Sequence, residues 1–329
     1  MKSVLRGRLA SFTLALVLSA AGALADDGGN QNDRGKQFEA DGPTVNAHDT
    51  NPIDGAPING ATGALSPIIN HFGSVMDTPK AYLIWYGNWK QSNGSDTPAG
   101  QQLVRDFLFG LSNSPYFQIN TTYSGPTGFV SVGTETTIAA AARSSLPVNN
   151  VFSVVSSAIT SGRLPKDLRG VYFVITSSDI VQTGFCTQFC GWHTHGILQT
   201  DPLPLPGSKI QDIRYAWVGN ANRCLNACAA QTVGPNGNAG VDGMLSVIAH
   251  ELDEATTDPD LNAWYDSRGE ESADKCAWTF GQNLTLDANR AYYNMSLPAA
   301  SGGSRNYLIQ RNLSAADNKC YVNFATKAQ

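Results

Sequence analysis

The sequence predicts an α/β fold, with a central, mainly parallel β-sheet flanked by helices and a disulfide-bearing, loop-rich C-terminal part. Three observations predict it. Compact apolar runs at 81–86, 170–176 and 214–219 are rich in β-branched and aromatic residues and bounded by turn residues, as in strands covered on both faces. Segments with helical spacing separate them, and all six cysteines lie between residues 186 and 320. Strands that alternate with helices indicate an α/β domain.

Three segments are predicted to be helices, and they span 100–111, 149–161 and about 241–256. In the third, apolar residues recur at mostly three- and four-residue steps. Asp242 stands where a carboxylate favours the positive end of the helix dipole, and Pro259 keeps the residue before it out of the helical region. Residues 261–322 are expected to be loop-rich, with short strands.

The N-terminal region has two parts. Basic residues precede a short apolar run that closes with Ala23-Leu24-Ala25, which predicts a cleavable signal peptide over residues 1–25. A retained membrane anchor is the rival interpretation, but no stop-transfer charges follow the run. Residues 26–63 are rich in Asp, Asn, Gly and Pro and predict a disordered leader. The remainder, 64–329, is expected to be a single globular domain.

Charge and hydropathy exclude two classes of partner. The formal net charge is −5, and removal of residues 1–25, which hold three basic and no acidic residues, changes it to −8. This balance argues against nucleic acid. No later apolar segment has the length of a bilayer span, so we expect no membrane span after signal removal. Asn-x-Thr sites such as Asn120 matter only in a host that glycosylates.

The cysteines predict up to three disulfides, because a chain that enters an oxidising compartment is expected to pair its thiols. Their layout groups Cys186 with Cys190 and Cys224 with Cys228, and leaves Cys276 and Cys320, which we expect to bond to each other. The two CxxxC pairs also have the composition of a four-thiolate zinc site, and this alternative stays open here.

Four stretches of the sequence contain recognisable motifs, and it is their combination, order and spacing that is informative. The stretches are 83–89 with 106–108, 172–179 leading to Cys186, 216–220 leading to Cys224 and Cys228, and 240–254. Together they resemble the EXORDIUM / phosphate-induced protein 1 family. The resemblance implies an extracellular protein, because the plant members are cell-wall or apoplastic proteins linked to growth and nutrient responses. It implies no catalytic residues. The His-Glu-Leu-x-Glu stretch resembles one of the family.

The most informative stretch for chemistry is this H-E-x-x-E sequence. On a helix, His250 and Glu254 project from the same face and can converge on one ion. Glu251 is then placed to take a proton from a metal-bound water, as in the related H-E-x-x-H motif. The alternative is an acidic helix face exposed to solvent, which Asp253 beside Glu254 supports.

A third ligand is needed, and His193 and His195 are both candidates because they would face the same side of a strand. Further acidic candidates follow the helix, namely Asp258, Glu270, Glu271 and Asp274. The expected metal is zinc. If several of these acidic residues bind, calcium or manganese suits the oxygen-rich site better.

Two functional hypotheses follow. In the first, the chain is a secreted, zinc-dependent metallohydrolase of peptidase type with Glu251 as general base. In the second, it is a non-catalytic extracellular binding or signalling protein with a structural ion or none. An extracellular peptide or a cell-wall or surface component is the expected partner. The expected location is extracellular, or periplasmic if a double-membrane bacterium retains the chain.

Overall fold

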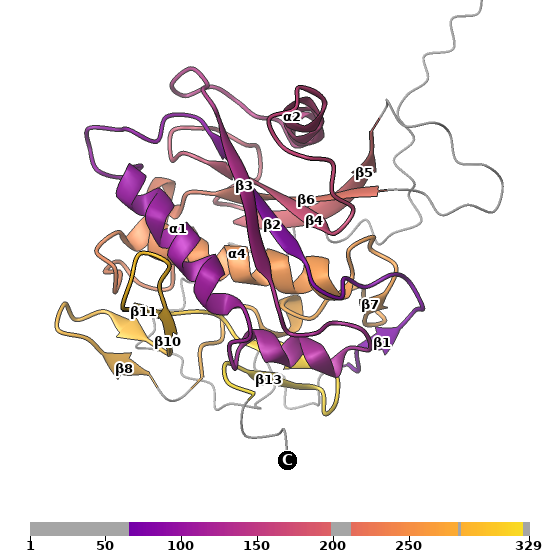
Figure 1. Cartoon of the computed structure of the whole chain (residues 1–329). Helices are drawn as coiled ribbons and strands as arrows, with labels where there is room; N and C mark the ends of the chain where they lie inside the picture. The colour runs from indigo at the N-terminus through magenta and orange to yellow at the C-terminus, as the bar shows by residue number, and fades with distance from the viewer. Residues whose placement is uncertain (1–65, 199–211, 282–283, 325–329) are drawn as a thin grey trace, which may run out of the picture.

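The structure is a computed structural model that describes residues 66–198, 212–281 and 284–324, so the predicted signal peptide and leader lie outside the described residues (Figure 1). The described helices are α1 (Pro98–Leu111), α2 (Val148–Thr160), α3 (Leu225–Cys228) and α4 (Ala239–Thr257), with 3-10 helices η1 (Phe117–Thr122), η2 (Ala221–Arg223) and η3 (Asp274–Cys276). The described strands are β1 (Ile69–Asn70), β2 (Lys80–Tyr86), β3 (Ser131–Ile138), β4 (Gly170–Thr176), β5 (Gly191–Ile197), β6 (Asp212–Gly219), β7 (Trp264–Tyr265), β8 (Thr285–Leu286), β9 (Tyr292–Tyr293), β10 (Met295–Pro298), β11 (Ser304–Tyr307), β12 (Asn312–Ser314) and β13 (Lys319–Tyr321).

A five-stranded sheet lies at the centre of the described residues, with the strand order β3-β2-β4-β6-β5. The apolar runs that predict strands form its middle, β2, β4 and β6, and every residue of β4 is buried. These three strands and β3 are mutually parallel, whereas the edge strand β5 runs antiparallel to β6. The sheet is therefore mixed, and the prediction of a mainly parallel sheet is confirmed in part.

The helices contact the sheet from its two faces. In β5, an added Cβ at Gly191 would meet Val247 of α4, whereas one at Gly196 would meet the ring of Phe152 in α2. Residues 191 and 196 are separated by an odd number of positions and so point to opposite faces. Thus α4 lies on one face and α2 on the other, and in Figure 1 α1 lies on the same side as α4.

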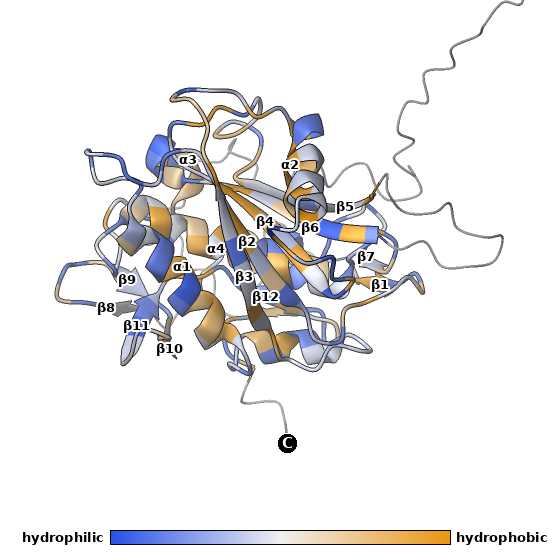
Figure 2. Ribbon diagram, turned by 45° about the horizontal axis from the view of Figure 1, so that its top comes forward, coloured by the Kyte–Doolittle hydropathy of each residue, from blue (hydrophilic) through white to orange (hydrophobic). Residues whose placement is uncertain are grey.

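Capping side chains explain where the predicted helices α1 and α4 begin. The Thr97 side chain accepts a hydrogen bond from the Gly100 backbone N–H, with Pro98 in the first turn, so α1 begins two residues earlier than the apolar pattern predicts. The Asn238 side chain caps α4 in the same way, and Asp258 ends it before Pro259. Figure 2 shows apolar colouring along the central strands and on parts of the helices that flank them.

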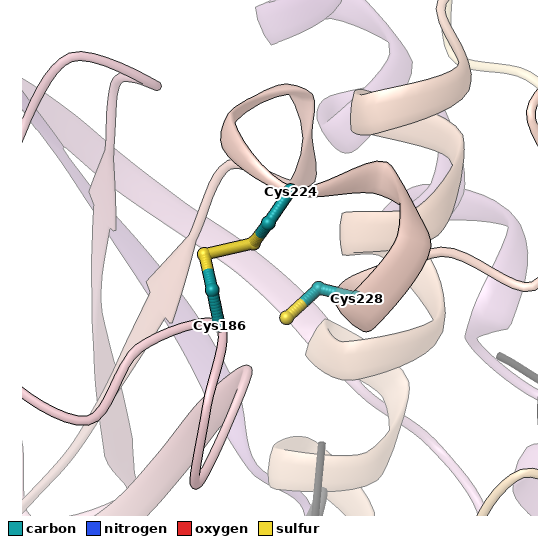
Figure 3. Close-up of side chains that lie close together, drawn as sticks. All are labelled: Cys186, Cys224 and Cys228. Carbon is teal, nitrogen blue, oxygen red and sulfur yellow. A yellow bond between two sulfur atoms is a disulfide. The ribbon is translucent and has the colours of Figure 1, made fainter. Parts of the chain in front are cut away.

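The disulfides join different partners than the layout suggests. Cys186 bonds to Cys224 and Cys190 bonds to Cys228, so each CxxxC segment is linked to the other and not within itself. Figure 3 shows the first bridge, with Cys228 beside it. Grouping the cysteines within each CxxxC segment was wrong, because the two segments lie side by side and each cysteine faces a partner in the other segment. All four sulfurs are oxidised, which also rules out the four-thiolate zinc site.

The prediction of a bridge between Cys276 and Cys320 is confirmed. It links η3 to β13, within a C-terminal part that consists of loops and short two-stranded sheets. Both cysteines are fully buried and pack with Tyr123 and Leu313 in a small second core. Among the described helices, none is long and apolar enough to cross a membrane.

Removal of this bridge should destabilise the C-terminal part. The sequence separation is 44 residues, and closing a loop of that size costs the unfolded chain about 4 kcal/mol in the chain-entropy account. We expect the Cys276→Ala, Cys320→Ala double variant to lose about 2–4 kcal/mol of unfolding free energy in urea denaturation followed by tryptophan fluorescence. A loss below about 0.5 kcal/mol would show that the bridge does not restrict the unfolded chain.

Candidate metal centre

Helix α4 is buried along almost its whole length, and only Ala239 and Gly243 of its 19 residues are not buried. The polar residues of the H-E-x-x-E stretch are included, with His250 1% exposed and Glu251 and Glu254 fully buried. The interpretation of this stretch as a solvent-exposed acidic face is therefore wrong. Ionisable side chains are buried only where charge partners, hydrogen bonds or metal ions compensate their desolvation.

The imidazoles of two predicted ligands, His250 and His193, lie next to the carboxylate of the third, Glu254. The Nε2 atom of His250 lies 3.0 Å from Oε1 of Glu254, as the four-residue helical spacing predicts. The Nε2 atom of His193, on strand β5, lies 3.8 Å from the other carboxylate oxygen, Oε2. One carboxylate of α4 thus stands between an imidazole of its own helix and an imidazole of the sheet.

The structure separates the two candidate histidines of β5. His193 is fully buried and faces Glu254, whereas the Nδ1 atom of His195 lies 3.3 Å from Oδ2 of Asp212. A second acidic residue near His195 is Asp260, whose carboxylate is held by two 2.7 Å bonds from Arg214. His193, and not His195, is therefore the histidine brought to the H-E-x-x-E helix.

Two of the four acidic candidates that follow the helix join the cluster. Oε2 of Glu271 lies 3.1 Å from Nε2 of His193, and Oδ1 of Asp274 lies 3.4 Å from Nε2 of His250. The backbone holds them in place, because the Asp274 N–H donates to Glu254 at 2.9 Å and the Glu271 N–H donates to Asp274 at 3.2 Å. The loop after α4 thus folds back over the histidines.

The other two acidic candidates have different partners. Asp258 accepts hydrogen bonds from the backbone N–H groups of Asn262 and Ala263, each at 2.6 Å, and so shapes the turn after α4. Glu270 is exposed enough to pair with Arg268 at 2.7 Å. Neither belongs to a group of ligand atoms around His193 or His250.

Glu251 follows His250 in the chain but is not part of either ligand group. It faces strand β5 at Gly191, where an added Cβ would lie 2.7 Å from its Oε1 atom. Glycine at this position therefore lets the strand approach the helix closely enough to place His193 next to Glu254. Glu251 thus lies at the contact between α4 and β5.

Burial controls the protonation of the site. It lowers the pKa of His193 to about 4, with His250 and His195 acting in the same direction and Asp258 and Asp274 opposing it. The imidazole is therefore neutral near pH 7, which is the form that binds metal ions.

Comparison with known proteins places the whole site within a conserved region. A profile described as "Phosphate-induced protein 1 conserved region" matches residues 68–322. The chain belongs to the phosphate-induced protein 1 family. This confirms the resemblance to EXORDIUM proteins, and the match contains every residue of the candidate centre.

Two plant proteins are among the relatives of this family member. Protein EXORDIUM-like 3 of Arabidopsis thaliana is 30% identical over 73% of this chain and 78% of its own length. Protein PHOSPHATE-INDUCED 1 of Nicotiana tabacum is 27% identical over 61% of this chain and 68% of its own. Among solved structures, metalloproteinase-II from Bacteroides fragilis matches with 15% identity and a TM-score of 0.26, over 62% of this chain and 46% of that chain. These last values are too low to support any argument.

One element of the site in this family member was not foreseen. Asp253 is fully buried and accepts hydrogen bonds from the Tyr116 hydroxyl at 2.7 Å and the Asn120 amide at 2.6 Å. Asn120 is itself held by Asn312 at 3.0 Å. Burial raises the pKa of Asp253 to about 7, although both hydrogen bonds oppose the rise. This network joins α4 to Tyr116 and Asn120 at the residue before Glu254.

Gly191→Ala should disturb the centre selectively. The new methyl group would overlap Val247 and Glu251 of α4, so the strand and the helix must separate. We expect a loss of about 1–3 kcal/mol in unfolding free energy, measured by urea denaturation. Gly196→Ala is the matched control on the opposite face of β5, where the new methyl meets only the partly buried ring of Phe152. Equal losses in both variants would contradict a special role for the approach at Gly191.

Proposed function

We propose that this chain is a secreted, metal-dependent hydrolase of peptidase type, in which His193, His250 and Glu254 belong to a divalent-cation centre and Glu251 is the general base. The observation that supports it is the convergence of these ligands from two distant segments. His193 on β5 and His250 on α4 approach the two oxygens of the same buried carboxylate at 3.8 and 3.0 Å.

The donor separations fit a metal ion within each of the two ligand groups that share Glu254, one with His193 and Glu271 and the other with His250 and Asp274. Ligands bound to one ion at about 2.0–2.2 Å lie roughly 2.8–3.6 Å from each other at the angles of tetrahedral or octahedral sites. The separations from His193 to Glu271 and from His250 to Glu254 and Asp274 are 3.1, 3.0 and 3.4 Å, and only the 3.8 Å separation is slightly longer. A cation also compensates the desolvation of buried carboxylates.

The chemistry of the donors narrows the choice of metal. Two imidazoles favour zinc or manganese over calcium, whose sites are built from oxygen ligands. The additional carboxylates of Glu271 and Asp274 suit manganese as well as zinc. Calcium is therefore the least suitable of the metals considered.

Hydrolysis assigns a definite role to Glu251. When bound, the metal ion would polarise the scissile carbonyl and acidify a water molecule. Glu251 would take a proton from that water as its oxygen bonds to the carbonyl carbon. The same carboxyl group would then give the proton to the leaving nitrogen as the C–N bond breaks, so that amide and water become carboxylic acid and amine.

A second candidate is a non-catalytic extracellular binding or signalling protein in which the ion only stiffens the fold. Burial of the centre favours this candidate. The side chains of His193, His250, Glu254 and Glu271 are at most 2% exposed, and Asp274 at 12% is the member of the cluster closest to solvent. A substrate would have to enter on the side of Asp274.

Three disulfides support the extracellular part of the proposal, because such bonds persist in oxidising compartments. Periplasmic retention in a double-membrane bacterium is compatible with the same chemistry. An extracellular peptide, or a peptide of the cell surface, is the substrate class that the proposal implies.

Metal content tests the centre itself. Mass spectrometry of the purified chain should find bound zinc or manganese, and His250→Ala or His193→Ala should lose it, because each removes an imidazole ligand. His195→Ala should keep the metal, since this side chain pairs with Asp212. His71→Ala, at an exposed ring stacked on Tyr265, is the surface control. A metal content that stays the same in His250→Ala as in the unsubstituted chain would refute the proposed centre.

Glu251→Gln distinguishes the two candidates. It should keep the metal and lower kcat/KM by about 10²–10⁴-fold on a quenched-fluorescent peptide library, because the amide cannot accept the proton. An intact metal centre that cleaves no peptide in either form of the chain would favour the non-catalytic candidate.

A further inference from the structure

Glu254 belongs to two ligand groups at once. With His193 and Glu271 it forms one group, and with His250 and Asp274 it forms another, and in each group the ligand atoms lie within 4.8 Å of one another. Its Oε2 atom faces His193 and its Oε1 atom faces His250. The geometry points to a centre for two divalent cations bridged by the carboxylate of Glu254, an inference that rests on the proposed metal centre.

Each imidazole stands between two carboxylates. Nε2 of His193 lies 3.1 Å from Glu271 and 3.8 Å from Glu254. Nε2 of His250 lies 3.0 Å from Glu254 and 3.4 Å from Asp274. A single N–H makes one directional hydrogen bond, whereas an ion attracts every donor around it. Each group therefore has the composition of a cation site, with one imidazole and two carboxylates.

The carboxylate of Glu271 also supports a cation at the His193 group. Oε1 of Glu271 is buried and accepts no hydrogen bond from the residues that the structure describes. A carboxylate oxygen that is removed from water in this way costs free energy unless a ligand compensates it. An ion at the His193 group would lie within reach of this carboxylate and would supply that compensation.

Formal charge also favours two ions. Glu251, Glu254, Glu271 and Asp274 together carry four negative charges when ionised. Two nearby cationic side chains bind elsewhere, because Lys275 pairs with Asp266 at 2.7 Å and Arg214 pairs with Asp260. One divalent ion would leave two negative charges in a buried site, and two would neutralise it.

Two ions change what the centre can do. Paired cations about 3.5–4 Å apart clamp the attacking and the departing groups of a hydrolytic displacement, as in aminopeptidases and phosphatases. The carboxylate bridge is the element that would set their separation. Manganese(II) or zinc(II) is the cation class that matches one imidazole and two carboxylates per ion.

The test is metal stoichiometry with manganese as the probe. The purified full chain is stripped by a chelator, loaded with Mn²⁺ alone and freed of excess metal, and then its metal content and its electron paramagnetic resonance spectrum are measured. We expect about two Mn²⁺ per chain and the spectrum of an exchange-coupled pair. One Mn²⁺ with the six-line spectrum of an isolated ion would overturn the inference and leave the proposed function standing. Absence of bound metal would overturn both.

Variants locate the two sites. Glu271→Gln and Asp274→Asn should each reduce the content to about one Mn²⁺ and convert the spectrum to that of an isolated ion, because each removes a ligand from one group only. Glu270→Gln is the matched control beside Glu271, since Glu270 pairs with Arg268. Circular dichroism verifies folding, and the stoichiometry of the unsubstituted chain decides the question if a variant does not fold.

Discussion

The close approach of strand β5 to helix α4 is the constraint on which the candidate centre depends. His193 reaches Glu254 only because Gly191, two residues earlier on the same face, has no side chain to hold the helix away. The Cys190–Cys228 bridge is adjacent to this point and ties the start of β5 to the segment that leads into α4. Backbone geometry and a covalent link thus act on the same contact.

A second constraint on α4 comes from Asp253, the residue before Glu254. Asp253 is enclosed by Tyr116 and Asn120, and this polar contact within the core defines the rotation of the helix about its axis. A rotation by one residue would carry His250 and Glu254 round together and move both away from His193 on β5. The ligand side and the Asp253 side of the helix therefore restrain each other.

The sequence predicts those elements whose residues show a single strong pattern. Strands β2, β4 and β6 are continuous apolar runs, and α4 has a helical period with a proline after its end. Strand β3 was not predicted because Ser131–Ile138 is an exposed edge strand with few apolar residues. Strand β5 contains glycine, threonine and histidine, so its composition gives little strand signal.

The candidate site also divides into residues that a local sequence pattern predicts and residues that only the tertiary fold brings together. His250, Glu251 and Glu254 are linked by helical spacing, which is local and can be read from sequence. The choice of His193 over His195 depends on where β5 meets α4, and the choice of Glu271 and Asp274 among four acidic residues depends on how a loop folds. Asp253 could not be connected to Asn120 at all, because 133 residues separate them.

The burial of Asn120 has a consequence for how the chain is made. Asn120-Thr121-Thr122 is an acceptor sequence for N-linked glycans, yet its amide is fully enclosed and bonded to Asp253. A glycan attached there would occupy the space between η1 and α4 and prevent the two from closing. A eukaryotic secretory host that modifies this asparagine before folding would therefore yield a chain in which the residues of the candidate centre cannot assemble. A bacterial host that does not glycosylate the asparagine would produce the chain without this interference.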